Sequence, residues 1–385
     1  MNNSLPREVR YLAVIQLKNG IDKYWRKSSH SGIKLKEREE IRSHLLEGCL
    51  NEADPQLALQ NALAISKVVR IDYPHDWPDI ITNLISILRV ANESNHLHLH
   101  RGLLTLLRIV KELASARLRR SQTSLKSITA ELVILLSQVY AQRVNQWLSF
   151  LLGNGDGEGG ATDAMENSLL ALKILKRLLL VGYEYPSHNK EVREFWDQSR
   201  HQFCQFLDMA TCEPPVIVSP AINFLQKHLV QLAKLHSGMG SDHPASYALL
   251  PNSLDLTRTY WTLIMKFGNT YSSLTSWNSK TSSLEKGPKN EQDFMEILAL
   301  KGMVILRACL KMAFGPNHSL KFRSAEIKDE QEEAALFFKT QLLTDVFVCQ
   351  MADIIMTKFF VFRPADLEAW EDVIFHIFLY CPSTN

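Results

Sequence analysis

The chain has 385 residues, of which 46% are hydrophobic and 22% are charged, and its formal net charge is only +2. Such a composition is typical of a globular protein with enough apolar residues for a sizeable core. A net charge this close to zero provides no global field that would favour nucleic acid or a membrane as the partner.

Cysteine usage and hydropathy exclude further classes. Six cysteines are scattered without a CxxC pair, which favours a reducing compartment over a disulfide framework. Arg7, Glu8 and Arg10 interrupt the N-terminal apolar residues, unlike the apolar core of a signal peptide. No uncharged apolar stretch reaches the length of about 18 residues that a membrane span requires, so we expect no membrane insertion.

The first predicted element is an amphipathic helix that starts near Arg7. Its apolar residues recur at helical spacing, which indicates one buried face. They are Val9, Leu12, Ala13, Leu17, Ile21 and Tyr24. A second helix is predicted from about Leu35 to Leu50.

The third predicted helix has recognisable signals at both ends. Asp54 can accept hydrogen bonds from the free amides of the first turn, and Pro55 suits the first helical position. Pro74 ends the helix because proline cannot continue the hydrogen-bond ladder. We expect Asp76 to cap the next helix, with Pro78 just inside it. The predicted buried positions are Ala58, Ala62, Ile65 and Val69 in the third helix, Ile81, Leu84, Ile85 and Leu88 in the fourth, and Leu99, Leu103, Leu106, Leu107, Val110, Leu113 and Ala114 in the fifth.

The rest of the chain continues as helices, and no run is typical of a strand. The predicted helices lie near residues 122–152, 163–183, 190–210, 215–236, 246–268, 291–313, 335–361 and 365–380. Three segments rich in Gly, Ser or charge are expected to be irregular and mobile. They are residues 153–160, 269–290 and 315–333.

Helix pairs recur about every 40 residues, which is the period of HEAT and armadillo repeats. The sequence therefore predicts an all-α fold, a HEAT-repeat solenoid in which each helix pair is buried against its neighbours. The alternative is a compact all-α domain of many helices. We expect repeats over residues 1–120 and 121–268, a flexible loop over 269–290, and further repeats over 291–385.

Two stretches carry a resemblance to a known family. "VRYLAVIQLKNGIDKYWRK" resembles the second helix of the first HEAT repeat in the importin-β (karyopherin) family. "ALQNALAISKVVRIDYPHDWPDIITNLISIL" is similar to the second helix of repeat two, the turn after it and the first helix of repeat three. "KNGIDKYWRK" and "RIDYPHDWP" look most like the importin-eleven subgroup. The resemblance is strong over residues 7–120, fair to about 210 and weak beyond.

The resemblance implies a nuclear transport receptor. Such a receptor binds protein cargo and Ran-GTP, and it enters the nuclear pore through weak contacts with Phe-Gly nucleoporins. It shuttles between cytoplasm and nucleus as a monomer, and Ran-GTP releases the cargo of an importin. The family also begins with a helix that pairs with the one starting at Arg7, and its members are longer. The resemblance therefore implies a fragment whose first helix exposes Val9, Leu12, Leu17 and Ile21.

The resemblance also implies where Ran would bind. In the family the second helices of the N-terminal repeats face Ran, so the polar residues of those helices are the candidates. They are Lys18, Asn19, Asp22 and Arg26 in the first repeat, Lys67 and Arg70 in the second, and Arg101, Arg108 and Lys111 in the third. For each of them a solvated surface charge is the alternative.

Aromatic and proline residues mark the first turns between repeats. Trp25 and Trp77 are predicted to plug these turns together with Tyr73, Pro74 and Pro78, and partner contact is the alternative. The seven basic residues between Arg101 and Lys126 favour an acidic protein partner over nucleic acid, because no aromatic residue is interleaved with them. The acidic segment Glu326–Ala334 could bind basic cargo or compete with it.

No signature of catalysis or of a cofactor is present. His96, His98 and His100 lack the further ligands that a zinc site needs, and the glycines at 153–160 do not follow a strand as a phosphate-binding loop would. We therefore expect neither an enzyme nor a cofactor. The alternatives to an importin are an exportin-type receptor and a HEAT scaffold outside transport.

Overall fold

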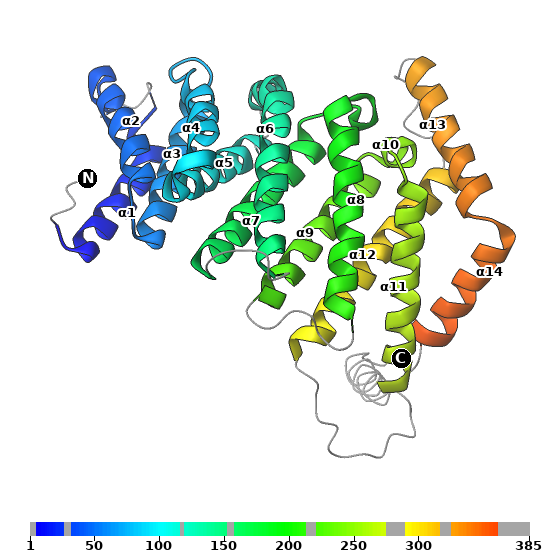
Figure 1. Ribbon diagram of the computed structural model, residues 1–385. Coiled ribbons are helices and arrows are strands. Elements are labelled where there is room, and N and C mark those ends of the chain that lie inside the picture. The colour runs from blue at the N-terminus through cyan, green and yellow to red at the C-terminus, as the bar shows by residue number, and fades with distance from the viewer. Residues whose placement is uncertain are drawn as a thin grey trace, which may run out of the picture. The chain divides into compact units, whose positions relative to one another are not determined.

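The structure is a computed structural model of the chain. It describes residues 5–26, 32–115, 119–151, 158–212, 221–274, 289–315 and 325–360. Every regular element within these ranges is a helix (Figure 1). The chain divides into two compact units, unit 1 (residues 1–235) and unit 2 (residues 236–385).

Unit 1 is a stack of helix pairs, as the solenoid prediction requires. Its elements are α1 (Arg7–Tyr24), α2 (Leu35–Leu50), α3 (Pro55–Asp72), α4 (Ile80–Ser94), α5 (His96–Ser115), α6 (Arg119–Leu151), α7 (Glu158–Val181), the 3-10 helix η1 (Pro186–His188), α8 (Lys190–Thr211) and most of α9 (Ala221–Asp242). Helices α2, α4 and α6 pack against α3, α5 and α7, respectively. The second helices also pack on one another, α1 on α3, α3 on α5 and α5 on α7. We call α1, α3, α5, α7 and α9 the second-helix row, and α2, α4, α6 and α8 the first-helix row.

The third helix begins as the sequence predicts. The carboxylate of Asp54 accepts hydrogen bonds from the amides of Gln56 and Leu57, both at 2.9 Å, and Pro55 is the first helical residue. The predicted core positions of α3 are completely buried, and in α5 the predicted leucines and Val110 are at most 3% exposed. Burial of each such side chain stabilises the fold by about 1.5–3 kcal/mol. α5 carries much of this burial because it packs against α2, α3, α4, α6 and α7.

Two expectations near the N-terminus are wrong. Helix α4 begins at Ile80 with Asp79 as the preceding residue, so Asp76 is not its cap and Pro78 lies outside it. The predicted exposed stripe on α1 is only partly exposed. Val9 and Leu12 are 49% and 60% exposed, but Ile21 is buried because α1 lies against α3.

Unit 2 contains α10 (Pro244–Leu249), α11 (Ser253–Leu274), α12 (Lys289–Phe314), α13 (Ala325–Phe337), the π-helical turn η3 (Phe338–Leu342), α14 (Asp345–Ile354) and the π-helical turn η4 (Ile355–Phe359). α11 packs along α12. Trp261 and Ile264 of α11, Ala299 and Leu306 of α12, and Met351 of α14 form a shared core.

Several predicted boundaries in the later chain are wrong. One helix over 335–361 is replaced by two, because Leu343 leaves helical geometry and Thr344 caps α14 by accepting from the amide of Phe347. Residues 325–333 are helical instead of irregular, as are 158–160, 269–274 and 289–290. The predicted helix at 365–380 and most of the three irregular segments lie outside the described residues. No described helix is both long and apolar enough to cross a membrane.

Candidate protein-binding surfaces

Asp22 of α1 links this helix to α3, its neighbour in the second-helix row. Its carboxylate accepts hydrogen bonds from Lys67 Nζ and from Arg70 Nη2, the latter at 2.9 Å. Arg70 Nη1 also lies 3.5 Å from a carboxylate oxygen of Glu112, so one ionic network extends over α1, α3 and α5. The hydrogen bond from Lys67 is the largest cause that lowers the pKa of Asp22, and the charges of Lys67, Arg70 and Arg26 act in the same direction.

The ionic network includes three of the six predicted Ran-facing residues of the first two repeats, Asp22, Lys67 and Arg70. Lys18 Nζ donates to Gln60 Oε1 at 2.7 Å, and Lys67 Nζ also lies 3.4 Å from the carbonyl of Lys18. Asn19 is exposed on α1, and Arg26 is exposed two residues beyond the end of that helix. Exposed ion pairs contribute only about 0–1 kcal/mol each, so these side chains can exchange their internal partners for an external one at little cost.

The three candidates on α5 differ in accessibility. Arg101 is only 5% exposed, and its guanidinium donates to the carbonyls of Glu52 and Ala53 at 2.8 and 2.9 Å. It therefore fastens α5 to the turn between α2 and α3 and presents little surface to a partner. Arg108 and Lys111 are half-buried, and burial lowers the pKa of both.

A larger basic surface continues beyond α5 along the second-helix row. Its members on α7 and α9 are not among the residues predicted from the sequence. On each of these helices basic residues recur three, four or seven positions apart, so they lie on one side of the helix. Lys176 Nζ donates to Gln231 Oε1 at 2.6 Å and so joins α7 to α9. We call this surface the basic face, and it consists of Arg108, Lys111, Lys173, Lys176, Arg177, Lys227 and Lys234.

Trp25 follows α1 directly and packs beside the end of α3. Its side chain is fully buried, and its indole Nε1 donates to Asp72 Oδ2 at 3.0 Å. Arg42 Nη1 lies 3.2 Å from the same oxygen and donates to the carbonyl of Asp76. Burial, the largest effect, raises the pKa of Asp72, whereas the bond from Trp25 and the charge of Arg42 oppose this rise.

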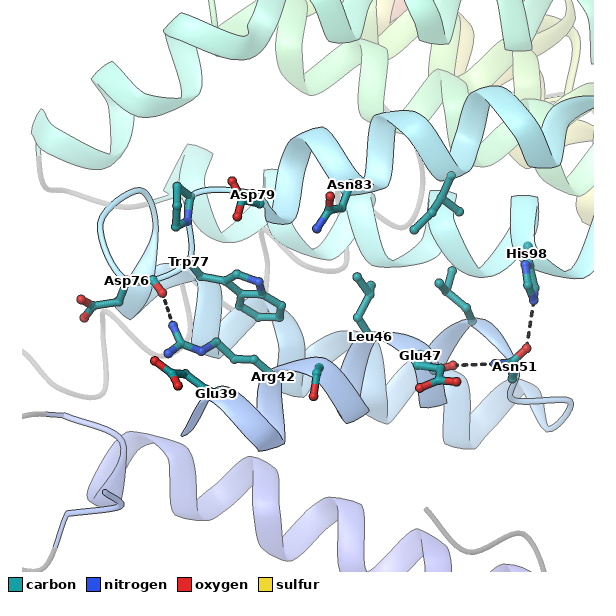
Figure 2. A pocket seen from close by; sticks show the side chains of 14 residues that line it. Glu39, Arg42, Leu46, Glu47, Asn51, Asp76, Trp77, Asp79, Asn83 and His98 are labelled. Carbon is teal, nitrogen blue, oxygen red and sulfur yellow. Dashed lines mark hydrogen bonds between the residues drawn. The ribbon is translucent and has the colours of Figure 1, made fainter. Parts of the chain in front are cut away.

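Tyr73, Pro74 and Trp77 come immediately after the end of α3. Tyr73 caps the end of α3 through its amide, which donates to the carbonyl of Val69 at 2.9 Å, and the Tyr73–Pro74 bond is cis. Trp77 is only half-buried. Its ring faces a groove of about 590 Å³ between α2 and the start of α4 (Figure 2).

The groove beside Trp77 has an apolar floor and an acidic rim. Leu46 and Leu50 of α2 and Ile87 of α4 line it with Trp77 and Pro78. Glu39, Glu47 and Asp79 lie around its edge, and Figure 2 shows Leu46 next to Trp77. The groove is therefore open to an apolar or aromatic side chain of a partner.

The histidine triplet gives no metal site. His98 Nε2 lies 3.0 Å from Asn51 Oδ1, and His100 Nε2 lies 3.6 Å from Glu166. Across the part of the chain that the structure describes, no three His, Cys, Asp or Glu side chains are grouped so that they could hold a metal ion.

The sequence is similar to those of known transport proteins of the importin type. Residues 1–51 match the importin-beta N-terminal domain. The chain is 28% identical to the importin beta-like protein KAP120 of Saccharomyces cerevisiae over 96% of its length, which covers 33% of that protein. It is 25% identical to mouse importin-11, again over 96% of its own length and over 34% of the relative's.

The fold is also similar to that of a nuclear transport receptor of known structure. Lph2, described as a novel bidirectional nuclear transport receptor of S. cerevisiae, superposes with a TM-score of 0.76 and 26% identity, over 98% of this chain and 35% of Lph2. In fold and in sequence the chain is similar to nuclear transport receptors of the importin-β type. The proteins that it resembles include importin-11, KAP120 and kap113 of Schizosaccharomyces pombe. The chain spans about a third of the length of these relatives.

Proposed function

We propose that the chain acts in nuclear transport as an importin that binds protein cargo and Ran-GTP and releases the cargo when Ran-GTP binds. The observation that carries the proposal is the exposed ionic network of Asp22, Lys67, Arg70 and Glu112 on the second-helix row. In the importin family this row faces Ran. We place the Ran-binding surface at Lys18, Asn19, Asp22, Arg26, Lys67, Arg70, Arg108 and Lys111. The buried Arg101 supports this surface from below.

Coupling between Ran and cargo follows from the stacked fold. In a stack of repeats each helix pair contacts only its neighbours, so small rotations between pairs add up along the chain. Two partners that prefer different curvatures of one stack weaken each other's binding by the difference in free energy. The energy of transport comes from hydrolysis of GTP by Ran, so the chain itself requires no catalytic residue.

Passage through the pore requires a second kind of contact. We propose that the groove between α2 and α4 accepts phenylalanine side chains of Phe-Gly nucleoporins, since Leu46, Trp77 and Ile87 offer an apolar floor. The chain would then shuttle as a monomer between the cytoplasm and the nucleus. An exportin-type receptor and a HEAT scaffold outside transport are the alternatives.

The test is nucleotide-dependent binding of Ran. The full chain should bind Ran loaded with a GTP analogue at least tenfold more tightly than Ran-GDP, measured by pull-down and by titration calorimetry; about 1.4 kcal/mol corresponds to that ratio. Lys18→Glu, Lys67→Glu and Arg70→Glu combined should abolish this preference, because they reverse the charge of the network.

The control has the same charge change on the first-helix row. Lys36→Glu, Arg89→Glu and Lys126→Glu combined alter exposed residues of α2, α4 and α6 and should leave the affinity for Ran-GTP unchanged. Equal losses in the two triple variants, or equal binding of both nucleotide forms by the unmodified chain, would contradict the placement of Ran on the second-helix row.

A further inference from the structure

The basic face gathers cations from three different helices without matching acids. Arg108 and Lys111 come from α5, Lys173, Lys176 and Arg177 from α7, and Lys227 and Lys234 from α9. Two acids lie at its margins. Glu112 is 3.5 Å from Arg70, a cation outside the basic face. Glu166 lies 3.6 Å from His100, whose pKa is lowered by burial, and its charge raises the pKa of Lys173.

The cations of the basic face lie close enough to lower one another's pKa. Burial, the largest effect, and the charges of Lys234, Arg177, Lys111 and Lys173 together lower the pKa of Lys176 to about 8. Burial and three neighbouring cations, Arg108, Arg177 and Lys173, lower the pKa of Lys111 in the same way. The pKa of Lys173 is lowered by burial, the largest effect, and by the charges of Lys227, Arg108 and Lys234, and it is raised by the charge of Glu166. Like charges held this closely destabilise the free protein, and an anion bound among them would remove that penalty.

Arg108 and Lys176 of the basic face have hydrogen-bond donors that are not used within the described residues. Arg108 Nε is buried and has no hydrogen-bond partner among the described residues. The Lys176 ammonium has three donor hydrogens, and the structure gives it one hydrogen-bond partner, the Gln231 side-chain oxygen. The remaining ammonium hydrogens of Lys176 can donate to carboxylate oxygens of a partner, whereas Arg108 Nε becomes accessible only if its side chain moves.

We propose that the basic face binds an acidic segment of a partner protein, a stretch of chain in which Asp and Glu recur. The arrangement of separate ammonium and guanidinium groups along three adjacent helices suits carboxylates spaced along a peptide. It suits nucleic acid less well, since no member of the basic face is aromatic and single strands are bound largely by base stacking. The neighbouring ring of Phe224 is covered by the ammonium of Lys227 at 5.0 Å.

The basic face shares Arg108 and Lys111 with the Ran-binding surface proposed above, but its five residues on α7 and α9 lie outside that surface. The residues on α7 and α9 do not belong to the network around Asp22, so they can be changed without touching it. A failure of one proposal therefore leaves the other standing.

The experiment measures binding of a labelled peptide of alternating Glu and Ser to the full chain by fluorescence anisotropy. The same peptide with Gln in place of Glu should bind at least tenfold more weakly. Lys173→Glu, Lys176→Glu and Lys234→Glu combined should abolish binding of the Glu peptide. The control combines Lys36→Glu, Arg89→Glu and Arg193→Glu, at exposed residues of α2, α4 and α8, and should retain binding. Equal loss in the two variants, or binding of the Gln peptide with equal affinity, would overturn the proposal.

The pH dependence gives an independent test. A bound carboxylate favours protonated Lys176, so affinity should be high near pH 7 and fall by about tenfold towards pH 9 as this lysine loses its proton. Lys176→Arg should keep the affinity at the lower pH and show a smaller fall, because arginine stays charged. A profile of Lys176→Arg that coincides with that of the unmodified chain would show that Lys176 does not contact the peptide. A single-stranded oligonucleotide of equal charge should bind more weakly than the peptide, and tighter binding would assign the face to nucleic acid instead.

Discussion

At the scale of single residues, the turn between the first repeats contains one carboxylate with two buried partners. Asp72 is 2% exposed and receives the indole N–H of Trp25 while it pairs with Arg42. Its other oxygen, Oδ1, has no hydrogen-bond partner among the described residues. Buried charges are tolerated only while they are paired, so Asp72 is a point at which the N-terminal repeats can be destabilised selectively.

Asp72→Ala should lower the free energy of unfolding by about 3–5 kcal/mol, because Arg42 remains buried without its counter-charge and the indole N–H of Trp25 loses its acceptor. The matched control is Asp22→Ala, which removes a carboxylate whose side chain is 47% exposed. This variant should lose only about 0–1 kcal/mol of the free energy of unfolding. Urea denaturation followed by circular dichroism compares the two. Similar midpoints for both variants would show that Arg42 finds another partner.

Sequence reasoning succeeded for residues whose signals are local and failed where the partner is distant in the chain. The Asp54 cap and Pro55 are readable from neighbouring positions, and the structure confirms both. The resemblance places Arg101 among the Ran-facing residues, yet Arg101 is buried, and carbonyls 48 and 49 residues earlier in the chain accept its hydrogen bonds. Nothing in the sequence shows which loop a buried arginine meets.

At the scale of helices, periodicity predicted the elements well and their ends less well. The apolar stripe of α5 and the pairing of helices follow from a strong period of 3.6 residues. The break at Leu343 was missed because apolar residues continue at helical spacing through it, while Thr344 caps a new helix. The basic face was missed for a related reason. Each lysine set is visible within its own helix, but the register between α5, α7 and α9 brings the sets together.

Contact between α6 and α7 gives a prediction at this scale. A side chain added at Gly182, at the end of α7, would collide with the side chain of Thr129 on α6 and lie 2.7 Å from the carbonyl of Leu178. Gly182→Ala should therefore destabilise the protein by about 1–3 kcal/mol through overpacking. The thermal midpoint measures this change.

Gly160, at the other end of α7, is the control for that substitution. A side chain added there meets no atom within 4 Å, so Gly160→Ala should be neutral or stabilise the helix by up to about 1 kcal/mol. Thr129→Ser combined with Gly182→Ala should recover part of the loss, because the serine lacks the colliding methyl group. A Gly182→Ala protein as stable as Gly160→Ala would mean that α6 and α7 separate easily at this end.

At the scale of the whole molecule, the even charge balance conceals a strong local asymmetry. The net charge of +2 excluded a uniformly basic protein, yet seven cations gather on α5, α7 and α9. Acidic residues elsewhere, including those of α13, bring the sum back towards zero. Partner recognition therefore depends on individual faces of the stack, which composition alone does not describe.

Passage through the nuclear pore is the property that tests the chain as a whole. The chain has a mass of 44.0 kDa, and it should enter the nuclei of permeabilised cells faster than an inert protein of equal mass if the groove beside Trp77 contacts Phe-Gly nucleoporins. Leu46→Glu places a charge on the apolar floor between Trp77 and Ile87 and should slow entry. The effect should be partial, about two- to fivefold, if further grooves share the binding, because weak sites act together through effective concentration.

Ile134→Glu is the appropriate comparison, since Ile134 of α6 is an apolar residue that is 51% exposed and does not line the groove. It should enter nuclei at the rate of the unmodified chain, and circular dichroism should confirm that both variants are folded. Entry at the rate of the inert protein would remove the pore-contact proposal while leaving Ran binding to its own test. Equal slowing by Leu46→Glu and Ile134→Glu would instead indicate that exposed apolar surface in general, and not the groove, carries the chain through the pore.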